Sequence, residues 1–197
     1  MYTVYGSIPS RAFRVLWMLE ELGEPYEFVQ AGPRSQAVLA LNPSGKVPVL
    51  LDGDAVLTDS TAILTYLADR HGKLTHAAGS LERARQDALT HTLLDEFDAL
   101  VWTAARHGFV LPEEHRVPAV KPSLKWEFAR NLERLAERLE GPFLQGEVMT
   151  VADIIATHCL NWAYGAKFPL ENKKMADYAS AMRARPAFKR VRALAQD

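Results

Sequence analysis

The sequence predicts an α/β domain followed by an all-α domain, and three observations lead to this fold class. In residues 1–72, short apolar runs with strand spacing alternate with longer runs that have helical spacing. Residues 73–80 are mostly small or polar, as in a linker, and from Leu81 onward no segment has a convincing strand pattern. We therefore expect domains at residues 1–72 and 81–197, joined by a linker at residues 73–80.

The first domain is expected to follow the order β-α-β-α-β-β-α. The predicted elements are a strand at 2–5, a helix at 10–22, a strand at 26–29, a loop with a short helix at 31–41, a hairpin at 47–57 and a helix at 60–70. Gly23 and Gly72 follow the two longer helices and are expected to end them. This order is that of a thioredoxin-like sheet with helices on both faces.

The second domain is expected to be entirely helical. Its predicted helices span residues 81–111, 123–139, 151–164, 173–183 and 187–195, and Pro112, Pro118 and Pro122 mark an irregular connection between the first two. Thr150 and Asp153 have the spacing of a capping box at the start of the third helix, with Asp in the place of the usual Glu or Gln.

Residues 42–60 contain a strand that begins with Val47-Pro48, the tight turn Asp52-Gly53, and Asp59-Ser60 at the start of a helix. Proline cannot donate to a sheet ladder, so it belongs at the first residue of a strand or at an edge. A cis Val47-Pro48 bond would turn the Val47 backbone outward, where it could pair with an extended peptide. The helix start offers free N–H groups that can hold a carboxylate.

This order of parts, together with the Thr-x-x-Asp box, resembles the glutathione transferases over the whole chain. The resemblance implies glutathione as co-substrate, with Val47 before cis-Pro48 pairing with its cysteinyl backbone, Asp59-Ser60 holding its γ-glutamyl group and Lys46 contacting a carboxylate. The family usually has Glu where this chain has Asp59. The resemblance also implies a homodimer, for which residues 60–70 and 81–106 are the candidate surfaces.

The family lowers the pKa of the glutathione thiol with a hydroxyl donor near the end of the first strand, and this chain offers Tyr5, Ser7 and Ser10. We favour Ser10, directly before Arg11, which corresponds to the serine-type classes; Ser10 as a plain helix cap is the alternative. Tyr5 corresponds to the tyrosine-type classes, and a backbone N–H at the first helix is the third option. Arg11 and Arg14 either shape the field around an anionic ligand or are simply solvated.

The remaining candidates concern the acceptor and other chemistry. Trp102, His107, Phe109 and Trp162, with Tyr164 and Phe168, are candidate walls of an apolar acceptor pocket. Cys159, the single cysteine, lies in an apolar helix and is expected to be a buried packing residue. The six histidines lack metal-ligand spacing, so we expect no metal.

The composition limits which classes of partner and which cellular compartment we expect. A formal net charge of −1 argues against nucleic acid and an anionic membrane surface as main partners, and no apolar run is long enough to span a membrane. With one cysteine and a strand pattern at the first residues, we expect a cytoplasmic protein. The expected activity is conjugation of glutathione to an electrophilic apolar acceptor. The alternatives are glutathione-dependent peroxide reduction or isomerisation, and a non-catalytic binding or regulatory role on the same fold.

Overall fold

The computed structural model describes residues 1–195, which form two compact units. The first unit contains residues 1–78 together with the described residues from Arg183 onward, and the second contains Gly79–Met182. The predicted linker therefore lies near the junction, whereas residues 183–195 fold with the first unit rather than with the helices that precede them. None of the described helices is both long and apolar enough to cross a membrane.

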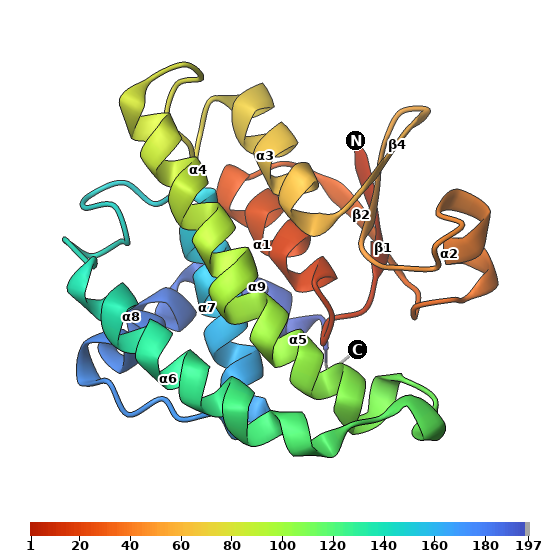
Figure 1. The fold of residues 1–197 in the computed structure, drawn as a ribbon. Helices are drawn as coiled ribbons and strands as arrows, with labels where there is room; N and C mark the ends of the chain where they lie inside the picture. Colours follow the sequence, from red (N-terminus) through yellow and green to blue (C-terminus); the bar gives the residue numbers. More distant parts are fainter. Residues whose placement is uncertain (196–197) are drawn as a thin grey trace. The chain divides into compact units, whose positions relative to one another are not determined.

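The first unit is built on a four-stranded mixed sheet of order β2-β1-β3-β4 (Figure 1). Its strands are β1 (Tyr2–Gly6), β2 (Tyr26–Gln30), β3 (Val49–Asp52) and β4 (Ala55–Thr58). β1 and β2 are parallel, and the other two pairs are antiparallel. The thioredoxin-like arrangement predicted from the order of elements is confirmed.

Helices cover both faces of this sheet. One face packs against α1 (Ala12–Leu22) and α3 (Ser60–His71), and the short α2 (Gln36–Leu41) lies on the other (Figure 1). The two faces follow from strand alternation: Val4 and Leu50 are fully buried toward the longer helices, whereas Tyr5 and Val49 pack with Val38 of α2.

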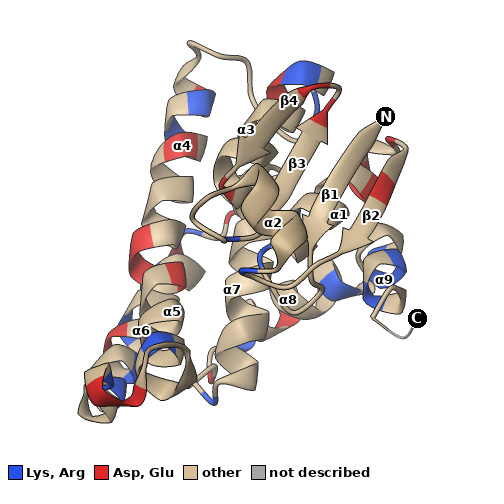
Figure 2. Ribbon diagram, turned by 90° about the vertical axis from the view of Figure 1, so that its right-hand side faces the viewer, with Lys and Arg blue, Asp and Glu red and all other residues tan. Residues whose placement is uncertain are grey.

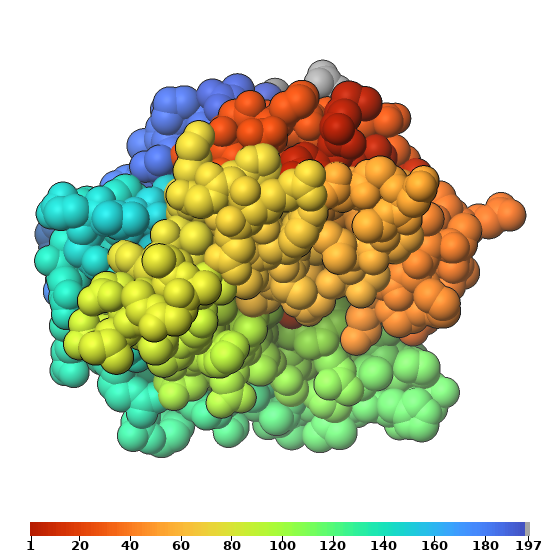
Figure 3. Space-filling view, turned by 90° about the horizontal axis from the view of Figure 1, so that it is seen from above, coloured from red at the N-terminus to blue at the C-terminus, as the bar shows by residue number. Residues whose placement is uncertain are grey.

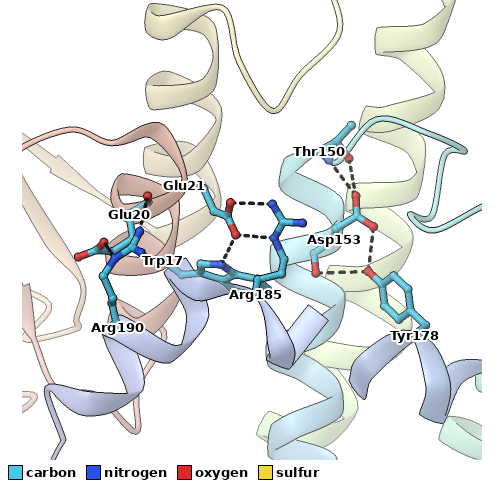
Figure 4. A network of polar contacts seen from close by, with 8 residues as sticks. All are labelled: Trp17, Glu20, Glu21, Thr150, Asp153, Tyr178, Arg185 and Arg190. Atoms are coloured by element: carbon cyan, nitrogen blue, oxygen red, sulfur yellow. Dashed lines mark hydrogen bonds and ion pairs between the residues drawn. The ribbon is translucent and has the colours of Figure 1, made fainter. Parts of the chain in front are cut away.

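The last helix, α9 (Pro186–Ala193), packs against α1. Phe188 lies 4.9 Å from Phe13 and 5.0 Å from Trp17 between ring centroids. α9 is also one of the basic segments of the molecule (Figure 2). Two arginines pair with glutamates of α1 (Figure 4). Arg185, directly before α9, pairs with Glu21 at 2.6 Å, and Arg190 within α9 pairs with Glu20 at 2.5 Å.

The second unit is all-helical over its described residues, as the sequence predicts. The elements are α4 (Leu81–Leu93), η1 (Leu94–Asp98), α5 (Ala99–Ala105), η2 (Arg106–Val110), η3 (Glu113–His115), η4 (Pro118–Val120), α6 (Lys121–Glu137), α7 (Val151–Gly165) and α8 (Lys173–Ala184). The predicted long helix over residues 81–111 is present, but η1 and η2 are π-helical insertions within it. Pro122 lies inside the first turn of α6, where its missing N–H costs nothing.

The predicted capping box at the start of α7 is formed. Asp153 is fully buried and accepts hydrogen bonds from the Thr150 N–H and the Tyr178 hydroxyl, each at 2.8 Å (Figure 4). It also accepts from the Leu144 N–H at 2.9 Å. Burial raises the pKa of Asp153, while these hydrogen bonds act in the opposite direction. Burial also raises the pKa of Tyr178 well above its ordinary value, so the phenol stays protonated and its O–H donates the hydrogen bond to Asp153.

Candidate functional site

Strand register brings three segments of the first unit to the same end of the sheet. Tyr5 of β1 pairs with Val49 of β3, and Val49 pairs with Thr58 of β4. Ser7 comes two residues after Tyr5, Val47 comes two residues before Val49, and Ser60 comes two residues after Thr58. The segments that the sequence predicts for the site, which lie at residues 7, 47 and 60, therefore leave the sheet side by side.

The first of these segments turns sharply from β1 into α1. A Cβ added at Gly6 would lie 2.3 Å from the Ala12 Cβ, so only glycine lets the strand end approach the helix start this closely. The turn carries both serines, and α1 begins at Ala12, two residues later than predicted.

The two serine hydroxyls have different surroundings. Ser10 Oγ donates to the Ser7 carbonyl at 2.7 Å and accepts from the Ala12 N–H at 3.1 Å, so its proton is already committed within the turn. The Ser7 hydroxyl is half-buried and forms no hydrogen bond within residues 1–195. Ser7, rather than Ser10, thus has a hydroxyl proton available to another group.

Tyr5 points to the other face of the sheet from Val4. Its ring packs, half-buried, against the cluster of Ala31, Val38 and Val49. The ring therefore has a packing role, whatever its hydroxyl contacts.

The second segment contains the expected cis Val47-Pro48 bond. Asn42 braces the approach to it, because its side-chain amide donates to the Lys46 carbonyl at 2.9 Å. Among the described residues, the Val47 N–H and C=O take part in no hydrogen bond, which leaves both groups for an extended ligand. The Lys46 side chain is exposed next to them.

The third segment is the start of α3. Asp59 is the N-cap: its carboxylate accepts from the Thr61 N–H at 2.9 Å and the Ala62 N–H at 3.1 Å. Its φ of 68° with ψ of 122° is a conformation that residues other than glycine rarely adopt, and such strain is concentrated at functional sites. Ser60 is buried, and its Oγ accepts from Arg14 Nη1 at 3.4 Å.

For Arg14 the sequence left two alternatives open, a role in the field around an anionic ligand and a solvated side chain, and the structure excludes the second. Arg14 is fully buried in α1. The available signal was its position: residues 12–19 of this helix are all buried, so an arginine among them is enclosed on every side.

The candidate acceptor residues belong to the second unit, and the structure brings some of them together. Trp102 of α5 and Trp162 of α7 are stacked at 6.5 Å between ring centroids, and His158 lies 4.5 Å from Trp162. His107 Nδ1 accepts from the Val117 N–H at 3.1 Å, and Phe109 is exposed.

The other two aromatic candidates do not join this group. Phe168 is buried against Phe128 at 5.2 Å, and Tyr164 is exposed. Cys159 is buried in α7, as expected of a packing residue. Across residues 1–195, no three His, Cys, Asp or Glu side chains are grouped as metal ligands would be.

Comparison with known proteins agrees with these features. Residues 1–76 match the family model described as the glutathione S-transferase N-terminal domain. The chain is 32% identical to glutathione S-transferase theta-1 of Bos taurus over 67% of its own length and 58% of the bovine protein. It is 30% identical to glutathione S-transferase 4 of Zea mays over 95% of its own length and 90% of the maize protein.

A solved structure extends the similarity over both units. The glutathione transferase URE2P6 from Phanerochaete chrysosporium, in complex with oxidized glutathione, is 25% identical and matches with a TM-score of 0.85 over 99% of this chain and 96% of that one. Sequence and fold similarity thus agree over nearly the full length, and this chain belongs to the glutathione S-transferase family.

Proposed function

We propose that the chain is a glutathione transferase that binds glutathione at the end of the sheet where Ser7, Val47 and Ser60 meet. The thiolate of the bound glutathione then attacks an electrophilic carbon of an apolar acceptor. The observation that carries this proposal is the strand register that gathers these three residues. Each would contact a different part of an extended tripeptide. A relative of the same fold was solved with oxidized glutathione.

The thiol would lie at the turn between β1 and α1. A thiol has an ordinary pKa of about 8.5, so only a small fraction is ionised at neutral pH. A hydroxyl that donates to the sulfur favours the thiolate and lowers that pKa, and the helix N-terminus acts in the same direction. We assign this donor to Ser7, since the Ser10 proton is bonded to the Ser7 carbonyl. Ser10 then holds the turn in shape.

The two ends of glutathione would be held by charge and by backbone. The N–H and C=O of Val47 pair with the cysteinyl unit, and Lys46 contacts the glycyl carboxylate. The γ-glutamyl carboxylate lies at the α3 N-terminus beside Ser60, and Asp59 accepts from the γ-glutamyl ammonium group. Because Asp59 already accepts from Thr61 and Ala62, the donors that remain for an anion at this helix start are the N–H and hydroxyl of Ser60.

The stacked pair Trp102 and Trp162 favours an apolar, aromatic acceptor, with His107 and Phe109 as further candidates. The only cysteine is buried in α7, which argues against catalysis through an enzyme mixed disulfide. Peroxide reduction by bound glutathione and isomerisation use the same thiolate, so they stay as alternatives, as does a non-catalytic binding role.

We also propose a cytoplasmic homodimer. In the first unit, the β3–β4 hairpin and α3 form a continuous part of the molecular surface (Figure 3). β4 is an edge strand, and Val56 on it is 43% exposed. Exposed apolar groups at a sheet edge are typical of a contact surface.

The decisive experiment measures the pKa of the enzyme-bound thiol by difference absorbance in the thiolate band. In the wild type we expect this pKa to lie well below the free value. Ser7→Ala should return it toward the free value and lower kcat, while the affinity for glutathione changes little, because the contacts of Val47 and Ser60 remain.

Ser10→Ala and Tyr5→Phe are the matched controls, each of which removes one hydroxyl. If only Ser10→Ala shifts the thiol pKa, Ser10 is the hydroxyl donor to the sulfur. If only Tyr5→Phe shifts it, the chain belongs with the tyrosine-type enzymes. No shift in any of the three variants would indicate a backbone N–H donor. Absence of glutathione binding and of turnover with a chloronitrobenzene acceptor would favour a non-catalytic role.

A further inference from the structure

Arg14 is a buried cation that lies next to the Ser60 hydroxyl. None of its surface is exposed, and its Nη1 donates to Ser60 Oγ over 3.4 Å, from the first turn of α1 to the first residue of α3. Burying a guanidinium is costly unless its donors are used. A helix that packs on a sheet does not need such a residue at a fully enclosed position.

The chemistry of the two groups fixes the direction of the Ser60 proton. A guanidinium has five N–H donors and no acceptor, so Ser60 Oγ can only accept from it. Ser60 donates to no group within the described residues, and the Asp59 carboxylate accepts from the backbone of Thr61 and Ala62. The Ser60 O–H therefore remains available for an acceptor that the described chain does not provide.

We propose that Arg14 is a positioning residue: by donating to Ser60 Oγ it holds the Ser60 hydroxyl as a donor toward the ligand, and with its buried charge it selects a ligand that carries a carboxylate there. This inference rests on the proposed function, in which that carboxylate is the α-carboxylate of the γ-glutamyl group. Arg14 acts through Ser60 and does not itself contact the ligand.

The inference predicts a selective loss, which a purely structural arginine would not produce. Affinities are measured by isothermal titration calorimetry for glutathione and for γ-aminobutyryl-cysteinyl-glycine, which lacks only the α-carboxylate. Arg14→Met keeps an apolar stem but removes the charge and the donors. We expect it to weaken glutathione binding about tenfold, the loss of one charge-assisted hydrogen bond, and to leave the analogue unaffected.

Three further variants sharpen the test. Arg14→Lys, which keeps a charge and a donor, should restore most of the preference for glutathione. Arg83→Met is the control for removing a buried arginine elsewhere, and it should leave both affinities unchanged. In the double variant Arg14→Met/Ser60→Ala, binding should be no weaker than in Ser60→Ala alone, because Arg14 acts through that hydroxyl.

Equal weakening of both ligands by Arg14→Met, or losses that add in the double variant, would overturn the inference. If Arg14→Met does not fold, as judged by circular dichroism, Arg14→Gln replaces it, and its loss must likewise be confined to glutathione. A wild-type protein that fails to bind glutathione would refute the proposed function itself. A wild type that binds both ligands equally would refute only the role of Arg14 and Ser60.

Discussion

Asp59 combines a positive φ of 68° with a side chain that accepts two backbone hydrogen bonds at the start of α3. Asp and Asn tolerate positive φ better than most residues, and both can cap a helix. The charge of Asp59 can therefore be removed without changing the cap, which makes it possible to separate a structural role from a role in binding.

We expect Asp59→Ala and Ser60→Ala each to weaken glutathione binding about ten- to a hundredfold, since a hydrogen bond involving a charged group contributes roughly 1.5–3 kcal/mol. Asp59→Ala should also lower the free energy of unfolding by about 1 kcal/mol through loss of the N-cap. Equilibrium titration with glutathione and urea unfolding measure the two effects.

Asp59→Asn is the control, because it keeps the cap and removes the charge. If Asp59→Asn binds glutathione as the wild type does, the acid is only a cap. If Ser60→Ala also binds normally, the start of α3 does not belong to the site.

Single residues show how far the sequence alone could lead. Val47-Pro48 and Asp59-Ser60 could be found because proline at a strand start and an acid before a helix are local signals. The commitment of the Ser10 proton to the Ser7 carbonyl could not, because it depends on the shape of a turn that Gly6 permits. Neither could the contact of Arg14 with Ser60, since it joins residues 46 positions apart.

At the scale of elements, the start of α7 depends on one buried carboxylate. Both oxygens of Asp153 act as hydrogen-bond acceptors. Oδ2 accepts from the N–H and hydroxyl of Thr150, and Oδ1 accepts from the Leu144 N–H and the Tyr178 hydroxyl. An amide cannot replace this group, because its NH₂ would face donors on whichever side it occupied.

We therefore expect Asp153→Asn to lower the free energy of unfolding by about 3 kcal/mol, and Tyr178→Phe, which removes one of the donors, by about half as much. Urea unfolding followed by circular dichroism checks both. A loss below about 1 kcal/mol for Asp153→Asn would mean that the buried network relaxes around the amide and is not what holds this helix start.

Elements also differ in how well a sequence predicts them. The capping box was predictable because Thr150 and Asp153 lie only three residues apart, so the pattern can be seen in the local sequence. The π-helical segments η1 and η2 were not, because they differ from an α-helix only in which carbonyl each N–H selects. Asn131 of α6 donates to the Glu96 carbonyl within η1 at 2.8 Å, a partner that helical periodicity does not identify.

At the scale of the whole molecule, Leu81 tests the proposed homodimer. It is 72% exposed at the first residue of α4, inside the predicted contact surface at residues 81–106. An acidic residue in the first turn suits the helix dipole, so Leu81→Asp should leave the fold intact while placing a charge in an apolar contact.

We expect the wild type to sediment as a dimer and Leu81→Asp to shift it toward monomer in analytical ultracentrifugation. Val117→Asp, at a residue 55% exposed outside the predicted surfaces, is the matched control and should stay dimeric. A monomeric wild type would contradict the proposed homodimer, and an unchanged Leu81→Asp variant would place the contact elsewhere.

The packing of α9 on α1 has a consequence for synthesis. Phe188 completes an aromatic cluster with Phe13 and Trp17, so the packing of α1 is finished by residues that are translated only after the whole second unit. Until then, α1 presents apolar surface that Phe188 later covers. Domains generally fold in order of emergence, but here the first unit must wait for the second to be made, and a stalled or truncated product carries an unfinished first unit.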